Sequence, residues 1–191
     1  MDVKVLAFAG SLRVGSFNKK LVKVAAEGAR KAGAQVTILD LRDYPLPVFD
    51  EDLEREQGLP SNARRLKDIF LTHQAFLISA PEYNSSITAA LKNAIDWISR
   101  PVPGESPLNC FDGKVAALLS ASPGALGGLR GLVAVRSILS NIKVIVLPDQ
   151  LAISKAHEAF QEDGTLKDPK QQAAVEAIAS RLVGVAGKLK G

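Results

Sequence analysis

The sequence predicts an α/β fold in which a five-stranded parallel sheet, with the strand order 2-1-3-4-5, carries helices on both faces. Five short apolar runs alternate along the chain with stretches whose apolar residues recur at helical spacing. Such alternation favours crossover connections, which make the strands parallel and cover the sheet with helices. The order 2-1-3-4-5 is our choice for a doubly wound sheet of five strands. With 191 residues, no internal repeat and no linker, residues 1–191 are expected to form a single domain.

The predicted strands are short, mostly apolar runs, as is typical of buried parallel strands. The first strand, residues 3–9, has the sequence VKVLAFA and ends at Gly10. Pro81 follows the third strand and a glycine-rich turn follows the fourth, so both strands end where regular structure is broken. The remaining strands are predicted at residues 35–41, 75–79, 114–121 and 143–147.

The helices are predicted from apolar spacing and from possible capping residues. In the first helix Leu21 and Ala25 recur at helical spacing, and Ser61 is the expected N-cap of the second. Residues 42–60, which contain prolines and the acidic run 50–52, are expected to form a solvated loop. The predicted helices span residues 17–31, 61–73, 86–99, 132–140 and 168–189.

Ligands of such sheets bind beyond the carboxyl ends of the strands, so the segments after strands 1, 3 and 4 are the candidate site. A helix start offers free N–H groups and the positive end of the helix dipole. The first segment adds hydrogen-bonding side chains there, and it therefore predicts a site for a terminal phosphate. The alternative is a plain turn in which a serine only caps the helix. The side chains in question are Ser11, Arg13, Ser16 and Asn18.

Two other phosphate-binding motifs fit the first segment poorly. The loop of nucleoside triphosphatases needs Gly-Lys-Ser/Thr at the helix start, and this is absent. The dinucleotide fingerprint needs a glycine where Leu12 stands, although its third glycine matches Gly15. Asp40 ends the second strand, where that fingerprint would provide a ribose-binding acid. Without the fingerprint, we expect Asp40 to have a surface or capping role.

The segment after the third strand is Pro81-Glu82-Tyr83-Asn84. Pro81 has a fixed φ and no N–H, so the strand stops and the next N–H groups can face a planar heterocycle. A flavin ring requires backbone donors at its pyrimidine oxygens and N5, beside an aromatic side chain. Tyr83 and Asn84 suit that requirement. The alternative is an ordinary strand-to-helix turn with Asn84 or Ser86 as the N-cap.

The segment after the fourth strand, residues 120–128, is rich in small residues and includes Ser122 and Gly124. Glycine lets the backbone approach a ligand closely. Donors here would face the N1 and O2 edge of a flavin, where negative charge accumulates on two-electron reduction. They would thereby raise the flavin potential. The alternative is a glycine-rich turn with no ligand.

Three motifs resemble the NADPH-dependent FMN reductase family, which includes quinone-, chromate- and azo-reducing members. They are Gly-Ser-Leu-Arg-x-x-Ser-x-Asn at residues 10–18, Pro-Glu-Tyr-Asn at 81–84 and Leu-Lys-Asn-Ala-Ile-Asp-Trp at 91–97. The resemblance implies a flavodoxin-like fold, bound FMN, and a homodimer or homotetramer with helix 91–97 near the flavin and a subunit interface. Carried over residue by residue, it assigns the phosphate to Ser11, Arg13, Ser16 and Asn18, the ring to Pro81, Glu82, Tyr83 and Asn84, and a looser role to Ser122 and Gly124.

The resemblance also implies an activity. Hydride from NADPH or NADH passes to N5 of FMN, and electrons then pass to a small acceptor: a quinone, a free flavin, an azo compound or a metal oxyanion such as chromate. Because the flavin carries the chemistry, no catalytic side chain and no metal site are expected. One rival is a flavodoxin-type electron carrier, although such carriers are generally acidic and this chain is basic. The others are a non-catalytic flavin-binding protein of the same fold and a serine hydrolase using Ser11, which lacks a Gly-x-Ser-x-Gly elbow.

Composition limits the partners and the compartment. The net charge is +4, but the basic residues are scattered among acids, so no nucleic-acid partner is expected. No apolar run approaches the ~20 residues of a membrane helix, so no membrane partner is expected. A single cysteine, Cys110, fits a reducing cytoplasm and is expected to be unreactive. His73 ends a predicted helix, where a protonated imidazole would suit the dipole, and Trp97 is expected in the core or an interface.

Overall fold

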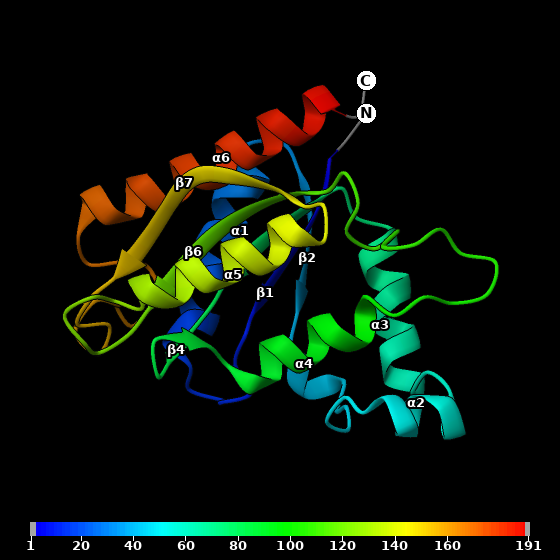
Figure 1. Cartoon of the computed structure of the whole chain (residues 1–191). Coiled ribbons are helices and arrows are strands. Elements are labelled where there is room, and N and C mark those ends of the chain that lie inside the picture. Colours follow the sequence, from blue (N-terminus) through cyan, green and yellow to red (C-terminus); the bar gives the residue numbers. More distant parts are fainter. Residues whose placement is uncertain (1–2, 190–191) are drawn as a thin grey trace.

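The computed structural model describes residues 3–189 and contains the predicted parallel sheet (Figure 1). The order is β2-β1-β3-β6-β7, and every neighbouring pair is parallel. Apart from a two-stranded hairpin that supplies β4 and β5, this is the expected order 2-1-3-4-5, which is confirmed. The strands are β1 (Lys4–Ala9), β2 (Gln35–Leu39), β3 (Ala75–Ser79), β6 (Val115–Ala121) and β7 (Ile145–Ile153).

Helices cover both faces of the sheet, and each face has its own core (Figure 1). Successive strand residues point to opposite faces, so in β1 Val5 and Ala7 join one core while Leu6 and Phe8 join the other. The second core contains the aromatic cluster of Phe8, Phe70, Phe76 and Phe111. The first face carries α1 (Phe17–Lys31) and α6 (Pro169–Leu189), and the second carries α3 (Ser61–Leu71), α4 (Ala89–Ile98) and α5 (Leu129–Asn141).

The helix starts differ from the predictions in several places. Helix α5, predicted from residue 132, begins three residues earlier, at Leu129. The expected loop 42–60 begins within a short 3-10 helix (Leu41–Asp43) and contains α2 (Glu51–Gln57). Asp50 caps the N-terminus of α2, where its side chain accepts the Asp52 N–H at 2.8 Å. The acidic run is therefore the start of a helix, where it suits the dipole. Ser61 is the first residue of α3 and not its cap, since Pro60 stands at the cap position. The helix expected from residue 86 begins three residues later, at Ala89.

The last strand is longer than the apolar run that predicted it. It continues through Pro148 and Asp149 to Ile153, with a register shift opposite Ala116–Leu118. A proline without an N–H is tolerated in β7 because the strand lies at the edge of the sheet and is irregular at that point. The continuation matters for the site, because it brings residues 150–153 beside the end of β6.

The expectation for His73 is wrong. Its ring is buried, with Nδ1 2.7 Å from the Ile69 carbonyl and Nε2 2.9 Å from the Thr37 hydroxyl. Burial and the nearby Lys114 ammonium lower the pKa of His73, so the neutral imidazole is favoured. Trp97, in contrast, is buried as expected, and Cys110, for which no burial was predicted, is buried as well. Among residues 3–189, no helix is long and apolar enough to cross a membrane.

Candidate active site

The three candidate loops leave the sheet side by side at its carboxyl edge. Gly10 donates its N–H to the Ser79 carbonyl at 3.0 Å, and Ala80 donates to Leu119 at 2.8 Å, so the ladder runs to the last residue of each strand. Ser122 likewise donates to the Ile153 carbonyl at 3.1 Å. The loops therefore begin from a rigid edge, as the strand order predicts.

The first loop leaves several hydrogen-bond donors without partners at the start of α1. Lys19 and Lys20 both donate their N–H groups to the Ser16 carbonyl, so the earlier N–H groups of the helix have no intrahelical partner. Ser16 stands at the N-cap, yet its hydroxyl makes no capping hydrogen bond, and the first turn holds no acid. Arg13 is exposed, and within residues 3–189 its guanidinium has no hydrogen bond or ion pair. A free cation, a free hydroxyl and free N–H groups are the donor set that suits a phosphate.

Ser11 and Asn18 are placed differently from Arg13 and Ser16. Ser11 is buried, and its oxygen accepts the Arg13 N–H at 3.3 Å, which turns the loop. Asn18 is buried and links α1 to two strand ends: its Oδ1 accepts the Ser79 hydroxyl at 2.8 Å and the Ala121 N–H at 3.0 Å, and its Nδ2 donates to the Ala121 carbonyl at 2.8 Å. The predicted contacts of both side chains with a phosphate stay predictions.

The second loop is a small hairpin rather than a strand-to-helix turn. β4 (Glu82–Tyr83) pairs with β5 (Ser86–Ile87), and the turn between them holds Asn84 at φ 51° and Ser85 at φ 65°. Positive φ at both central positions is the geometry of a tight hairpin turn. Pro81 is buried, while the Tyr83 ring is 54% exposed. An exposed aromatic beside a tight turn suits the edge of a flat ring.

Thr88, which the sequence analysis did not identify, joins the first loop to α4. Its hydroxyl donates to the Gly10 carbonyl at 2.6 Å and accepts the Leu91 N–H at 3.1 Å. Thr88 is thus the N-cap of α4, and not Asn84 or Ser86, which the alternative interpretation of this segment would have placed there. A Thr three residues before Leu91 is an N-cap signal that was available in the sequence.

The Leu91–Trp97 motif has a structural use in this chain. Trp97 is fully buried, donates Nε1–H to the Pro47 carbonyl at 2.8 Å and meets the Phe49 ring edge-on at 4.9 Å. Asn93 donates to the same carbonyl and accepts the Phe49 N–H, both at 2.8 Å. Two residues of α4 therefore hold the segment before α2 in place.

The third loop lies against the segment that follows β7. The Ser122 hydroxyl accepts the Gly124 N–H at 3.2 Å, and the Gly124 carbonyl accepts the Lys155 N–H at 3.4 Å. Gly127 has φ 62° and lies so close to Ile153 that a Cβ there would come within 2.7 Å of backbone. The turn is therefore compact and offers small residues to a ligand.

Asp40 has the capping role expected of it. Its Oδ1 accepts the Arg42 N–H at 3.0 Å, and its carboxylate pairs with Lys19 Nζ at 2.6 Å. Partial burial would raise the pKa of Asp40, but the bonds from Lys19 and Arg42 outweigh it and lower the pKa. The ion pair occupies this carboxylate, as a surface cap requires.

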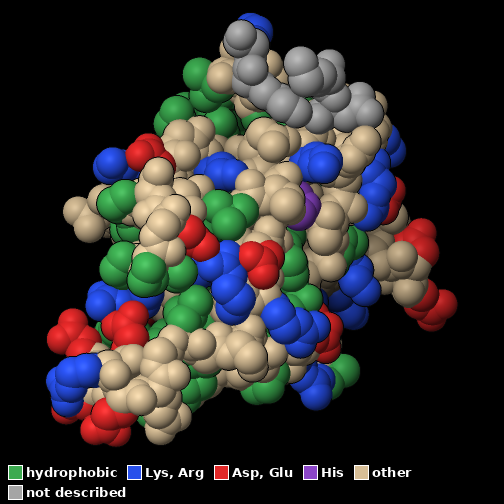
Figure 2. All heavy atoms as spheres, turned by 90° about the vertical axis from the view of Figure 1, so that its right-hand side faces the viewer, with side chains coloured by type: hydrophobic (Ala, Val, Ile, Leu, Met, Phe, Trp, Pro, Cys, Tyr) green, Lys and Arg blue, Asp and Glu red, His purple; other side chains and the backbone are tan. Residues whose placement is uncertain are grey.

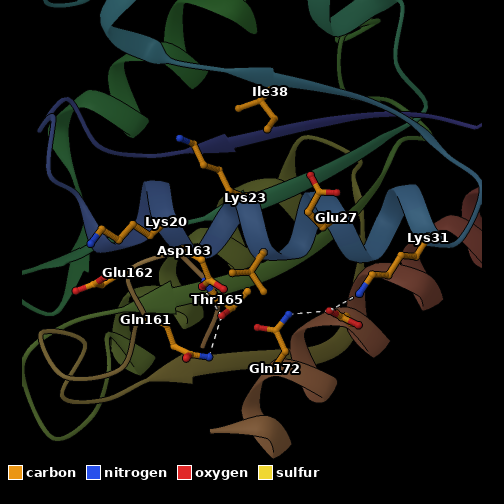
Figure 3. A pocket seen from close by; sticks show the side chains of 13 residues that line it. Lys20, Lys23, Glu27, Lys31, Ile38, Gln161, Glu162, Asp163, Thr165 and Gln172 are labelled. Carbon is orange, nitrogen blue, oxygen red and sulfur yellow. Dashed lines mark hydrogen bonds and ion pairs between the residues drawn. The ribbon is translucent and has the colours of Figure 1, made fainter. Parts of the chain in front are cut away.

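A cavity of about 320 Å³ joins the first and second loops; it is lined by Gly10, Ser11, Leu12, Arg13, Tyr83, Thr88, Ala89 and Ala90. A larger cavity of about 560 Å³ lies elsewhere, between α1, α6 and residues 161–165 (Figure 3). Its walls carry charges of both signs, such as Lys23 and Glu27, and several are already bonded to one another, as Lys31 is to Glu176. The smaller cavity is therefore the candidate site, because it alone of the two touches the candidate loops.

Charges on the surface are mixed. On the face shown in Figure 2, lysine and arginine side chains alternate with acidic ones, and no broad patch of one sign is visible. This agrees with the scattered basic residues of the sequence. The positive character of the site comes from local groups, namely Arg13 and the start of α1, and not from the net charge.

The five-stranded parallel sheet, its strand order and the helices on both faces define the class: a flavodoxin-like protein. Residues 3–158 match the family model described as NADPH-dependent FMN reductase, and the chain belongs to this family. It is 36% identical over 176 residues to the NAD(P)H-dependent FMN reductase of Pseudomonas aeruginosa, a match that covers 92% of this chain and 90% of that protein.

Two further relatives agree. The quinone reductase of Pseudomonas putida KT2440 is 36% identical over 181 residues, covering 92% of each chain. The solved structure of a flavoenzyme NAD(P)H:(acceptor) oxidoreductase from Paracoccus denitrificans aligns with a TM-score of 0.82 and 31% identity over 97% of this chain and 98% of that one. The expected fold, enzyme class and cofactor are thereby confirmed: an NAD(P)H-dependent flavin oxidoreductase that uses FMN.

Proposed function

We propose that this protein holds FMN across its three loops and passes electrons from NAD(P)H to a quinone. The observation that carries the proposal is the start of α1, where the Arg13 guanidinium, the Ser16 hydroxyl and the first helical N–H groups lack partners within the described residues. The proposal includes a single domain over residues 1–191, assembly as a homodimer or homotetramer, and a cytoplasmic location.

The phosphate would lie against the first loop. Arg13 and Ser16 donate to its oxygens, and the helix N–H groups add the dipole. Ser11 shapes the loop through its bond to the Arg13 N–H, and its hydroxyl would still be able to donate to the phosphate. Asn18 fixes the helix start through Ser79 and Ala121, and its second amide hydrogen would be left to donate to the phosphate. These residues bind and orient, and none of them reacts.

The ring would lie over the cavity between Gly10 and Tyr83, with Pro81 and the hairpin turn along its edge. Glu82 and Asn84 offer backbone N–H groups there, while Ser122 and Gly124 approach the opposite edge. When bound, FMN supplies the chemistry: it accepts a hydride from the nicotinamide and delivers electrons to the next substrate. The protein orients the ring, keeps one face open to substrates and excludes water from the other.

A quinone is the acceptor that the loop surfaces favour. Each of the three loops presents an exposed apolar side chain, Leu12 at 52%, Tyr83 at 54% and Leu126 at 51%. A flat, largely apolar acceptor would be bound by such surfaces, whereas a small oxyanion would not. The quinone reductase activity named for the Pseudomonas putida relative supports the same choice.

Flavin binding tests the proposal. Titration of the flavin-free protein with FMN should show roughly 100-fold weaker binding for Arg13→Ala/Ser16→Ala, because two hydrogen bonds to a charged group are lost. The matched control is Arg55→Ala/Ser180→Ala, which changes exposed residues on α2 and α6. Unchanged FMN affinity in the first variant would overturn the phosphate site.

Steady-state kinetics tests the reaction. With NADPH and benzoquinone, parallel lines in initial-velocity plots are expected, because the nicotinamide leaves before the quinone enters the same face. Intersecting lines would contradict one shared site. No consumption of NADPH would favour an electron carrier.

A further inference from the structure

The hairpin that carries Tyr83 has little to stabilise it by itself. β4 and β5 contribute only two residues each, and a two-stranded hairpin is marginal in isolation. Both central residues of its turn, Asn84 and Ser85, have positive φ although neither is glycine, a conformation that L-residues adopt at a cost. Contacts from outside the hairpin must therefore stabilise this conformation.

The Glu82 side chain provides that attachment. It turns away from the cavity to the first turn of α5, where Oε2 accepts the N–H groups of Arg130 at 3.0 Å and Gly131 at 3.3 Å. Its Oε1 accepts Arg130 Nε at 2.7 Å and pairs with the Arg130 guanidinium at 2.6 Å. The Glu82 side chain is 8% exposed, whereas the Arg130 side chain is 59% exposed, so the carboxylate is buried while its guanidinium partner faces solvent.

Helix α5 packs closely against the hairpin. A Cβ at Gly131 would lie 3.2 Å from Glu82 Cβ and 3.3 Å from the Ser86 carbonyl, so α5 touches both strands of the hairpin. Burial would raise the pKa of Glu82, but the bonds from Arg130 and Gly131 outweigh it and lower the pKa. The ionised carboxylate is therefore favoured, and it lies at the positive end of the α5 dipole as well as beside the guanidinium.

We propose that Glu82, paired with Arg130, is a positioning residue that fixes the hairpin to α5 and so joins the second and third loops into one wall of the flavin site. This rests on the proposed function for the ligand, but the attachment itself does not require one. The Glu82 side chain touches neither substrate nor cofactor in this assignment. It acts through Tyr83 and Asn84, whose backbone it holds.

The attachment is tested first without flavin. Amide hydrogen exchange over residues 83–87 should rise in Glu82→Gln and in Arg130→Met, because each variant removes the charged pair. Glu27→Gln, which breaks the exposed Glu27–Arg30 pair on α1, is the control and should leave these amides unchanged. Two variants are used so that the test remains decisive if one of them folds poorly. Circular dichroism shows which variant is folded, and the exchange of that variant is then compared with the control. Unchanged exchange in both would overturn the proposal.

The link to the site is tested with FMN and riboflavin, which differ by the phosphate. Glu82→Gln should weaken both flavins by a similar factor of roughly ten, because one charged hydrogen-bonded group is lost while the phosphate site is intact. Arg13→Ala/Ser16→Ala should weaken the binding of FMN but not the binding of riboflavin. Loss of FMN binding without loss of riboflavin binding in Glu82→Gln would overturn the positioning role. If instead Arg13→Ala/Ser16→Ala had no effect while Glu82→Gln raised exchange, the phosphate site would fail and the attachment would stand.

Discussion

Replacing Asn18 by alanine should destabilise the whole protein, and not only its ligand site. The variant leaves three buried groups without partners: the Ser79 hydroxyl, the Ala121 N–H and the Ala121 carbonyl. Ser79 and Ala121 are 0% and 3% exposed, so water cannot replace the amide without a local opening. Each unpaired buried group costs about 1–3 kcal/mol, which sets an expected loss of about 3–5 kcal/mol after the chain relaxes.

Asn18→Asp separates the geometry of this side chain from its chemistry. The carboxylate has the same shape and can still accept from Ser79 and Ala121, but it cannot donate to the Ala121 carbonyl. It also places a negative charge against that carbonyl oxygen and near the expected phosphate. We expect a loss close to that of the alanine variant, because a buried charge without a cation is costly.

Urea unfolding gives the measurement. Trp97 is the single tryptophan and is fully buried, so its fluorescence reports the transition. Asn141→Ala, an exposed asparagine at the end of α5, is the control and should change stability by less than about 0.5 kcal/mol. If Asn18→Ala lost less than about 1 kcal/mol and only weakened FMN, the reasoning would be refuted, and Asn18 would be a phosphate ligand and not a link between strands.

Three further predictions concern the scaffold. The folded-state pKa of His73 lies below its ordinary value of 6.5, so at low pH the unfolded chain binds a proton more readily than the native state does. The free energy of unfolding should therefore fall as the pH drops below about 6.5. Urea unfolding at pH 5 and at pH 7.5 should show a smaller fall for His73→Gln than for the original protein. Gly28→Ala should lower the free energy of unfolding by about 1–3 kcal/mol, because the new Cβ would lie 2.8 Å from Glu176 Cα on α6. Gly184→Ala, which has open space around the new Cβ, should instead stabilise the protein by about 0.5–1 kcal/mol. Thermal unfolding of the two variants checks this, and equal effects would contradict it. Burial raises the pKa of the Cys110 thiol, so N-ethylmaleimide should label it only after unfolding, and mass spectrometry showing rapid labelling of the native protein would disprove this.

The fold could be predicted from the sequence because its signals are local. Five apolar runs separated by helical spacing are sufficient for a doubly wound sheet, and Gly10 and Pro81 mark where strands end. The errors are local too. The composition of the acidic run 50–52 predicts a solvated loop, because the capping bond forms only once Asp50 adopts an extended backbone. The apolar run of the last strand predicts an end before Pro148, because the sequence does not reveal that β7 lies at an edge.

The division of labour within the site could not be predicted in the same way. The motif 10–18 does not distinguish Arg13, Ser16 and Asn18. In the structure the Asn18 side chain is bonded to residues 61 and 103 positions away, while the Arg13 guanidinium has no partner in residues 3–189. Glu82 belongs to the motif 81–84, but its partner Arg130 is 48 positions later and has no motif of its own. A short motif indicates which residues gather at a ligand. Long-range hydrogen bonds decide which of these residues contact the ligand and which position the contacting residues. Those bonds follow from the strand order and not from the spacing within the motif.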